Sequence, residues 1–413
     1  MMNTRMDRKR LNIGTYHLKP YARTEQHVKD LADCGIDFVI CMDYDEKTLD
    51  LFAKHGVGAI VSGIVPGWWG GDGDNAGTLE SKTPLTRYFD AAAKFKDHPA
   101  IWGIDIGDEP SALDFPHYGR IFDAVNGAFP KQFPYLNLYP NYASVSKNTE
   151  DQALSQLGTR TYDEHIQKYC ELVPADYISY DFYVYCTTVR KCYENLVTVA
   201  DACRRTGRSM WIILQVNSHV PQGWMNEDML RFQAFSSMAF GAENITWACY
   251  TAGWWYNQVL DENGEKTVQY DRLRKVNGEI RAMAPLYMKY LSTATHFVGF
   301  DTVPDIEGSS IVSVKSLSTG YFRNLKADDG LPLVVGEMNS REGDGSRALF
   351  IFAADDWKGE NRKHRRVTFE TTGIAPALAA FDPQGKKVLE KNPDGSYSFD
   401  IDSNSCCMIT IRP

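Results

Sequence analysis

Residues 100–107 read AIWGIDIG, a short apolar run that leads directly into Asp108, Glu109 and Pro110. The run is too short for a buried helix, and its residues do not alternate strictly between apolar and polar, which is typical of a strand covered on both faces. Seven further runs of this kind lie between residues 11 and 255. They are LNIGTYHL (11–18), DFVICMDY (37–44), GAIVSGI (58–64), PYLNLYP (134–140), YISYDFYVY (177–185), MWIILQVN (210–217) and NITWACYT (244–251).

Helical patterns separate the runs, for example in residues 25–35, 48–56, 192–207 and 225–242. Three of these segments reach a glycine where a helix would end, at Gly35, Gly56 and Gly207. Asn226 or Glu227 is placed to open the helix before the last run. Eight strands that alternate with helices predict a closed parallel (β/α)₈ barrel. A doubly wound open sheet is the rival, disfavoured by the count of eight and by the lack of GxGxxG after the first strand.

The composition changes after about Leu291. Segments such as 348–356, 365–372 and 406–413 are short, and turn signals such as Pro383-Gln384-Gly385 separate them. The sequence therefore predicts an antiparallel β-sandwich as a C-terminal domain over residues 291–413, after a barrel domain over residues 1–290.

The overall composition is that of a globular protein, with 413 residues, 43% hydrophobic and 12% aromatic. The net charge of −9 makes nucleic acid a poor partner. No run of about 18 apolar residues predicts a membrane span, and no signal peptide is visible, although export with the signal removed stays open. The nine cysteines and nine histidines show no metal-ligand spacing, so we expect no metal and no cofactor. The compartment and the oligomeric state are not decided.

The strand ends carry the candidate chemistry, because the active site of such a barrel is built at the C-terminal ends of its strands. Carboxylates, amides and aromatic rings dominate there, and these groups bind hydroxyls and the apolar faces of sugars. The candidates for substrate binding are Tyr16, Asp43, Trp68, Trp69, Asp108, Asn137, Tyr139, Tyr183, Gln215, Asn217, His219, Trp254 and Trp255. The four tryptophans lie in segments that contain glycine, where paired rings are hard to bury, so we expect them to stack on sugar.

Residues 98–110, HPAIWGIDIGDEP, resemble the strand-four motif of clan A glycoside hydrolases. The resemblance implies that Glu109 is the acid that protonates the glycosidic oxygen and that Asp108 stands where the clan has an asparagine for the sugar 2-hydroxyl. In outline the chain also resembles family 42 glycosidases, in which β-rich domains follow the barrel. The implied activity is hydrolysis of O-glycosidic bonds in an oligosaccharide or polysaccharide fragment.

The strand-seven run departs from that pattern. Retaining enzymes of the clan have a glutamate nucleophile there, whereas the aligned residue here is Gln215, and an amide cannot form the covalent intermediate. Asp181 is the best substitute carboxylate, followed by Asp43 and Asp45. We favour an inverting mechanism with Asp181 as the general base and Gln215 as a ligand of a substrate hydroxyl.

Other interpretations remain beside this one. Glu109 can be an ordinary ion-pairing residue, and Asp181 is about as well explained as a residue that orients substrate. Asp105 shares the strand parity of Glu109 and is expected to be structural. A catalytically silent carbohydrate-binding protein is the main alternative function, because Gln215 favours it. A metal-dependent barrel enzyme is disfavoured by the lack of a ligand cluster.

Overall fold

The computed structural model describes residues 5–63, 73–86, 96–146, 154–300, 311–372 and 377–412. Eight parallel strands form a closed barrel in chain order, and β1 pairs with β8 to close it. The barrel prediction is confirmed. The strands are β1 (Asn12–Tyr16), β2 (Phe38–Met42), β3 (Gly58–Val61), β4 (Ile101–Asp108), β5 (Phe133–Leu138), β6 (Tyr177–Phe182), β7 (Ser209–Gln215) and β8 (Ala242–Ala248).

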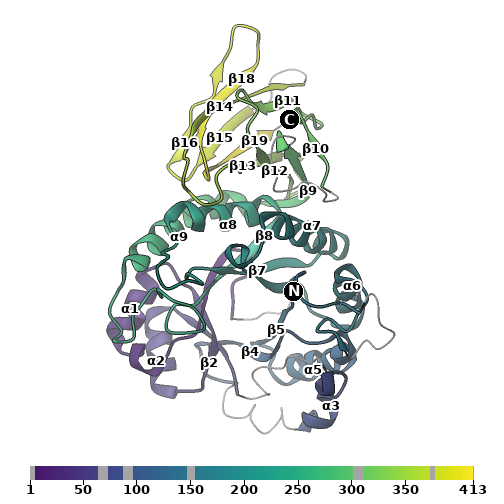
Figure 1. Ribbon diagram of the computed structural model, residues 1–413, viewed down its shortest axis with the longest axis vertical. Helices are drawn as coiled ribbons and strands as arrows, with labels where there is room; N and C mark the ends of the chain where they lie inside the picture. The colour runs from purple at the N-terminus through teal and green to yellow at the C-terminus, as the bar shows by residue number, and fades with distance from the viewer. Residues whose placement is uncertain are drawn as a thin grey trace.

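Helices surround the barrel in Figure 1. The three glycines predicted to end helices adopt positive φ angles of 83° at Gly35, 71° at Gly56 and 70° at Gly207. Asn226 caps the helix before β8, because its side chain accepts from Met229 N at 2.8 Å. The helices are α1 (Glu25–Asp33), α2 (Glu46–His55), α3 (Leu79–Lys82), α5 (Phe115–Ala128), α6 (Tyr162–Leu172), α7 (Val189–Thr206), α8 (Glu227–Ala239) and α9 (Val268–Tyr287), with 3₁₀ turns η1 (Pro20–Ala22), η2 (Gly73–Asn75), η3 (Ala112–Asp114) and η5 (Val184–Cys186).

The C-terminal part is a β-sandwich, as predicted. A seven-stranded sheet in the order β10-β9-β12-β13-β19-β15-β16 faces a four-stranded sheet in the order β11-β14-β18-β17. Between them lies a core of buried side chains that includes Leu325, Val335, Ile351 and Phe369. The strands are β9 (Tyr290–Val298), β10 (Ser313–Val314), β11 (Phe322–Ala327), β12 (Leu333–Ser340), β13 (Arg347–Ala353), β14 (His364–Thr371), β15 (Ala377–Asp382), β16 (Gly385–Lys387), β17 (Glu390–Lys391), β18 (Tyr397–Asp402) and β19 (Cys406–Arg412).

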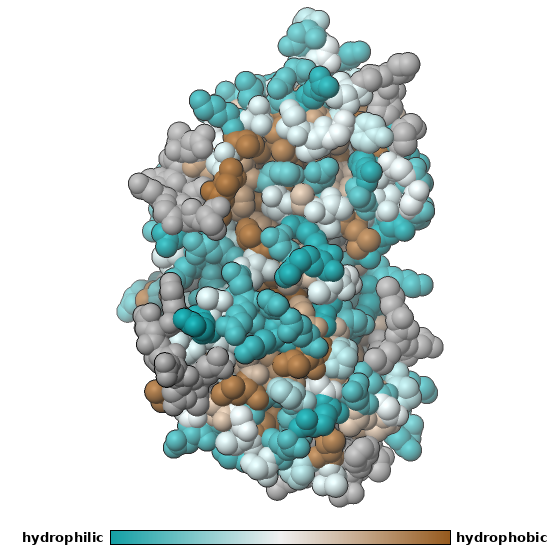
Figure 2. Space-filling view, turned by 90° about the vertical axis from the view of Figure 1, so that its right-hand side faces the viewer, coloured by the Kyte–Doolittle hydropathy of each residue, from teal (hydrophilic) through white to brown (hydrophobic). Residues whose placement is uncertain are grey.

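The other face of the seven-stranded sheet packs on the barrel. Figure 1 shows the sandwich standing on α7, α8 and α9. Phe352 of β13 meets Phe232 of α8 with ring centroids 5.7 Å apart, and Phe297 of β9 meets Tyr193 of α7 at 5.2 Å. Barrel and sandwich residues therefore share one hydrophobic core. On the side shown in Figure 2, the hydrophobic residues in view gather above and below this junction.

Candidate active site

A cavity of about 560 Å³ opens at the C-terminal ends of the barrel strands. All eight strands meet at this end of a (β/α)₈ barrel, so residues far apart in the chain are brought together there. The described residues that line the cavity are Tyr16, His17, Cys41, Asp43, Ser62, Asp108, Glu109, Asn137, Asp181, Tyr183, Ile213 and Trp254.

The end of β4 places two carboxyl groups in this cavity. The pairing of β4 with β5 shifts between Asp105 and Gly107, so that Asp105 and Asp108 both direct their side chains inward. A side chain at position 107 would stand 2.3 Å from the Tyr118 hydroxyl, so only glycine fits in this irregular part of the strand. Glu109 follows with φ at 47°, a left-handed conformation that is rare outside glycine and clusters at functional sites.

Glu109 and Asp181 are in direct contact through a hydrogen bond between their carboxyl groups. Two carboxyl groups can share such a bond only when one of them carries a proton. Asn137 fixes the arrangement, because its Nδ2 donates to Asp108 Oδ1 at 3.0 Å and to Asp181 Oδ1 at 2.9 Å. Its Oδ1 in turn accepts from Ser179 Oγ at 3.0 Å, and this bond fixes the orientation of the amide.

Burial raises the pKa of each of these carboxyls. Glu109 keeps its proton well above the ordinary range of a glutamate, because it is desolvated and lies beside the charges of Asp181 and Asp108. Burial also raises the pKa of Asp181 and that of Asp108. The arrangement therefore holds a protonated Glu109 against an acceptor carboxylate, which is the pairing that general acid and base catalysis requires.

Asp105 lies under the cavity and belongs to the same network. Its carboxylate accepts from Ser62 Oγ at 2.8 Å, from Cys41 Sγ at 3.5 Å and from Gly107 N at 3.2 Å. Burial raises its pKa to about 7. The residue is 2% exposed and does not line the cavity, so its contacts are those of a support beneath Asp108.

Replacing Asp105 by asparagine is expected to make stability less dependent on pH. Because the folded-state pKa lies above the unfolded one, the stabilising contribution is complete below about pH 4 and is lost as the pH rises through about 7. Between pH 5 and pH 8 the wild-type protein should therefore lose about 2–3 kcal/mol more unfolding free energy than Asp105→Asn. Urea unfolding at both pH values measures this, with Asp33→Asn as the matched exposed control. An equal loss in the wild-type protein and in Asp105→Asn would contradict the raised pKa of Asp105.

Aromatic rings form one side of the cavity mouth. Tyr16 packs edge-on against His17 at 4.6 Å and against Trp254 at 5.4 Å between ring centroids. Trp254 is 49% exposed. Burial and the charge of Lys19 lower the pKa of His17 to about 4, so this ring is neutral at pH 7. The mouth thus offers three aromatic rings, set edge-on to one another, beside the carboxyl groups.

The end of β7 carries no carboxylate. Ile213 lines the cavity beside Asp181, its register partner on the neighbouring strand β6. Gln215 is fully buried, and its Nε2 donates to Asn217 O at 2.9 Å. Gln215 is not among the residues that line the cavity. Its amide, which was predicted to bind a substrate hydroxyl, is hydrogen-bonded to the protein's own backbone.

Eight of the residues predicted from the sequence line the cavity: Tyr16, Asp43, Asp108, Glu109, Asn137, Asp181, Tyr183 and Trp254. Five others lie elsewhere. Tyr139, Gln215 and Asn217 are buried, His219 is exposed on the loop after β7, and Trp255 packs edge-on against Tyr183 at 4.4 Å. Trp68 and Trp69 lie outside the described residues.

Four further residues line the cavity and were not among the predicted site residues: His17, Cys41, Ser62 and Ile213. Cys41 is partly buried and its Sγ donates to Asp105 Oδ2 at 3.5 Å. All four lie within the apolar runs, and that position is the signal that would have found them. The side chains of Cys41, Ser62 and Ile213 are small or apolar, so residue type alone does not mark them.

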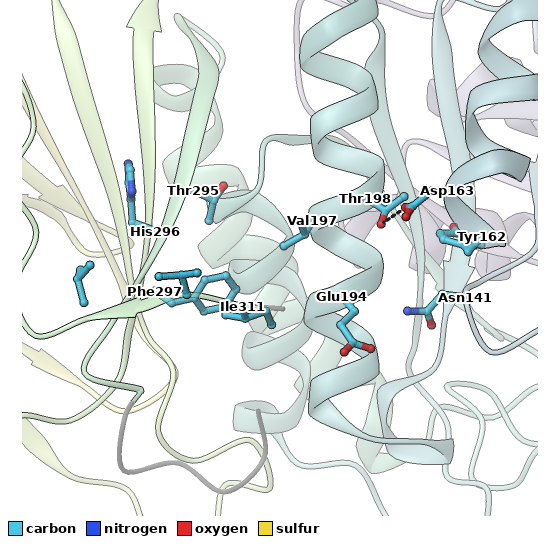
Figure 3. A pocket seen from close by; sticks show the side chains of 12 residues that line it. Asn141, Tyr162, Asp163, Glu194, Val197, Thr198, Thr295, His296, Phe297 and Ile311 are labelled. Carbon is cyan, nitrogen blue, oxygen red and sulfur yellow. Dashed lines mark hydrogen bonds between the residues drawn. The ribbon is translucent and has the colours of Figure 1, made fainter. Parts of the chain in front are cut away.

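A second hollow, of about 650 Å³, lies between barrel and sandwich. Figure 3 shows Glu194, Val197 and Thr198 of α7 on one side and Thr295, His296 and Phe297 of β9 on the other. None of the predicted site residues lines this groove. Within the described residues, no group of three or more His, Cys, Asp or Glu side chains is arranged to hold a metal ion. None of the described helices is long and apolar enough to cross a membrane.

The fold and the cavity together define a (β/α)₈-barrel protein with a C-terminal β-sandwich and a carboxyl-rich pocket. Among solved structures, the chain is similar to a family 42 β-galactosidase from G. stearothermophilus, with a TM-score of 0.59, 9% identity and 98% of each chain covered. It is also similar to a cycloisomaltooligosaccharide glucanotransferase from Paenibacillus sp., with a TM-score of 0.55, 8% identity, and 98% of this chain and 85% of that chain covered. No protein-family model and no curated protein sequence matches the chain.

Proposed function

We propose that the protein is a glycoside hydrolase that cleaves O-glycosidic bonds in an oligosaccharide or polysaccharide fragment. The observation that carries this proposal is the buried contact between Glu109 and Asp181, in which one carboxyl keeps a proton that the other accepts. The similarity of the fold to that of a β-galactosidase and a glucanotransferase supports the same class of chemistry.

In the proposed reaction, Glu109 donates its proton to the glycosidic oxygen as the bond to the anomeric carbon breaks. A water molecule adds to that carbon, and its proton passes to a carboxylate base. We assign the base role to Asp181, which Asn137 holds by a hydrogen bond of 2.9 Å. Asp108 accepts the second hydrogen of the Asn137 amide and is placed to accept from a sugar hydroxyl as well.

The spacing of the two carboxyls bears on stereochemistry. Inverting enzymes separate acid and base by about 6.5–9.5 Å, and retaining enzymes separate acid and nucleophile by about 5–5.5 Å. Glu109 and Asp181 touch, so a substrate must part them before either mechanism can operate. We propose inversion, since β7 supplies no carboxylate nucleophile. NMR of the first-formed anomer tests this, and retention would assign the attack on carbon to another group.

A catalytically silent carbohydrate-binding protein is the second candidate. It is favoured by Gln215, because the resemblance to clan A enzymes implies a glutamate nucleophile at this position and this chain has an amide, which donates to Asn217 O. A panel of nitrophenyl glycosides and polysaccharide fragments separates the two functions. Release of nitrophenol or of shorter products supports the hydrolase, whereas binding by calorimetry without any product supports the silent protein.

Replacing Trp254 by alanine is expected to weaken binding of the correct sugar by about 1 kcal/mol or more, because an exposed ring at the cavity mouth is lost as a stacking surface. Trp224→Ala is the matched control, since Trp224 is 41% exposed and does not line the cavity. Calorimetric titration measures both variants. Equal affinities for Trp254→Ala and the wild-type protein would assign this ring to packing.

A further inference from the structure

We propose that Trp357, which the β-sandwich contributes, is a positioning residue for the candidate active site. It holds the segment after β6, which carries Tyr183 beside Asp181 at the cavity wall. This inference rests on the proposed function for its effect on turnover, although the restraint itself can be measured without any activity.

The contact joins Trp357 to Tyr185, two residues after Tyr183. The two rings stack with centroids 5.5 Å apart and an angle of 9° between their planes. The Tyr185 hydroxyl lies 2.6 Å from Trp357 O and 3.0 Å from Met229 O, so its single proton is held between one carbonyl of the sandwich and one of α8. Tyr185 is thereby fixed by its ring and by its hydroxyl.

The loop that presents Trp357 is itself held by hydrogen bonds to Asp356 and lies close to the start of α8. The Asp356 carboxylate accepts from Glu360 N at 3.0 Å and from Asn361 N at 2.8 Å, and the residue is 6% exposed. Gly359 has φ at 67°, and a Cβ there would stand 2.7 Å from Asn226 Oδ1. Only glycine therefore allows this loop to lie so close to the start of α8.

A second connection runs from the same loop to the end of β7. Asn226, the cap of α8, donates from Nδ2 to Lys358 O at 3.0 Å. About two turns further along α8, Gln233 accepts from Gln215 N at 3.0 Å and donates to Gln215 O at 2.9 Å. Residues 356–359 thus contact elements that hold the ends of both β6 and β7, next to Asp181 and Ile213.

These contacts give the sandwich a role in the geometry of the site. A misplacement of about 1 Å at a catalytic group can cost on the order of 10²-fold in rate. Release of the segment after β6 would allow such a displacement, because Asp181 and Tyr183 lie within four residues of Tyr185.

The test compares Trp357→Ala with Tyr397→Ala in the full chain. Tyr397 is a half-buried aromatic residue of the four-stranded sheet that stacks on Phe369 at 5.8 Å, so its loss perturbs the sandwich away from the barrel. Trp357→Phe tests rescue by a smaller ring that keeps the stacking. Thermal unfolding of all three variants measures how far each loss destabilises the fold.

The readout that does not need activity is the rate at which Cys186 reacts with a thiol reagent. Cys186 follows Tyr185 directly and is exposed, with its Sγ 3.9 Å from Gln215 Oε1. Trp357→Ala is expected to raise this rate about 2- to 10-fold, the equilibrium change that loss of one aromatic pair gives, whereas Tyr397→Ala should leave it unchanged. A Cys186→Ser background identifies the contribution of the other thiols.

Kinetics on a cleaved glycoside complete the test. We expect Trp357→Ala to lower kcat by about tenfold or more while Trp357→Phe retains most of it and Tyr397→Ala all of it. An unchanged Cys186 rate in Trp357→Ala overturns the inference, and so does a raised rate with unchanged kcat. If the wild-type protein cleaves no glycoside, the proposed function fails, while the Cys186 rates still decide whether Trp357 restrains the segment.

Discussion

Replacing Glu109 by glutamine is expected to lower kcat for glycoside hydrolysis by about 10²–10⁴-fold and to leave the fold intact. The glutamine side chain is nearly the same size and can still donate a hydrogen bond to Asp181, so the buried contact survives. It cannot transfer a proton to the leaving oxygen. The loss corresponds to about 3–5 kcal/mol of barrier.

The size of the effect should depend on the leaving group. An aryl group that leaves without protonation needs no acid, so Glu109→Gln should lose much less activity on such a substrate than on an alkyl glycoside or a natural fragment. Steady-state kinetics on both substrates measure this difference. Glu80→Gln is the control, since the Glu80 side chain is 69% exposed and pairs only with Arg120 at 2.6 Å among the partners the structure records. If Glu109→Gln turned over the alkyl glycoside at the wild-type rate, Glu109 would not be the general acid.

The barrel was predictable because each strand is covered on both faces and therefore reads as an unbroken apolar run. Residues 100–107 and 210–217 are examples, and both prove to be strands of the closed barrel. The helix ends at Gly56 and Gly207 were predictable for a local reason, since the left-handed conformation there favours glycine. The sandwich followed from turn signals between short segments.

The site was predictable only as a set of strand ends. Asp108, Glu109, Asn137 and Asp181 come together because parallel strands in a barrel end on one face. Their mutual contacts were not predictable, since strand parity places Asp105 and Glu109 on one face, whereas the shift in pairing within β4 turns Asp108 inward beside Asp105. No local pattern in a sequence marks such a shift, apart from a glycine such as Gly107.

Contacts between residues far apart in the chain account for the remaining differences between the sequence predictions and the structure. Trp357 lies 172 positions from Tyr185, and nothing near it in the sequence links it to the barrel. Trp255 was predicted to face substrate from its place beside Trp254; the structure places its ring edge-on against Tyr183, and a contact with substrate stays a prediction. Spatial neighbours of this kind depend on how elements far apart in the chain pack together, which residue type and spacing do not encode locally.

Replacing Asp181 by asparagine is expected to lower kcat by about 10²–10⁴-fold, because the carboxylate that accepts the proton of water is lost. The fold should survive, since asparagine keeps an oxygen that can accept from Asn137 Nδ2. Asp176→Asn is the matched control. Asp176 immediately precedes β6, at the opposite end of the barrel, where it pairs with Arg8. Full activity of Asp181→Asn would remove Asp181 from the chemistry.

The same variant should change the titration of Glu109. Asp181 raises the pKa of Glu109 in two ways, by its negative charge and by the hydrogen bond that it accepts from the protonated carboxyl. Asparagine carries no charge, so the pKa of Glu109 should fall while staying above its ordinary value, because burial and Asp108 still raise it. Since Glu109 acts only when protonated, the alkaline limb of residual activity should move to lower pH. Carbon NMR titration of the labelled Glu109 carboxyl measures the shift directly, and an unchanged pKa would mean that the two carboxyls do not share a proton.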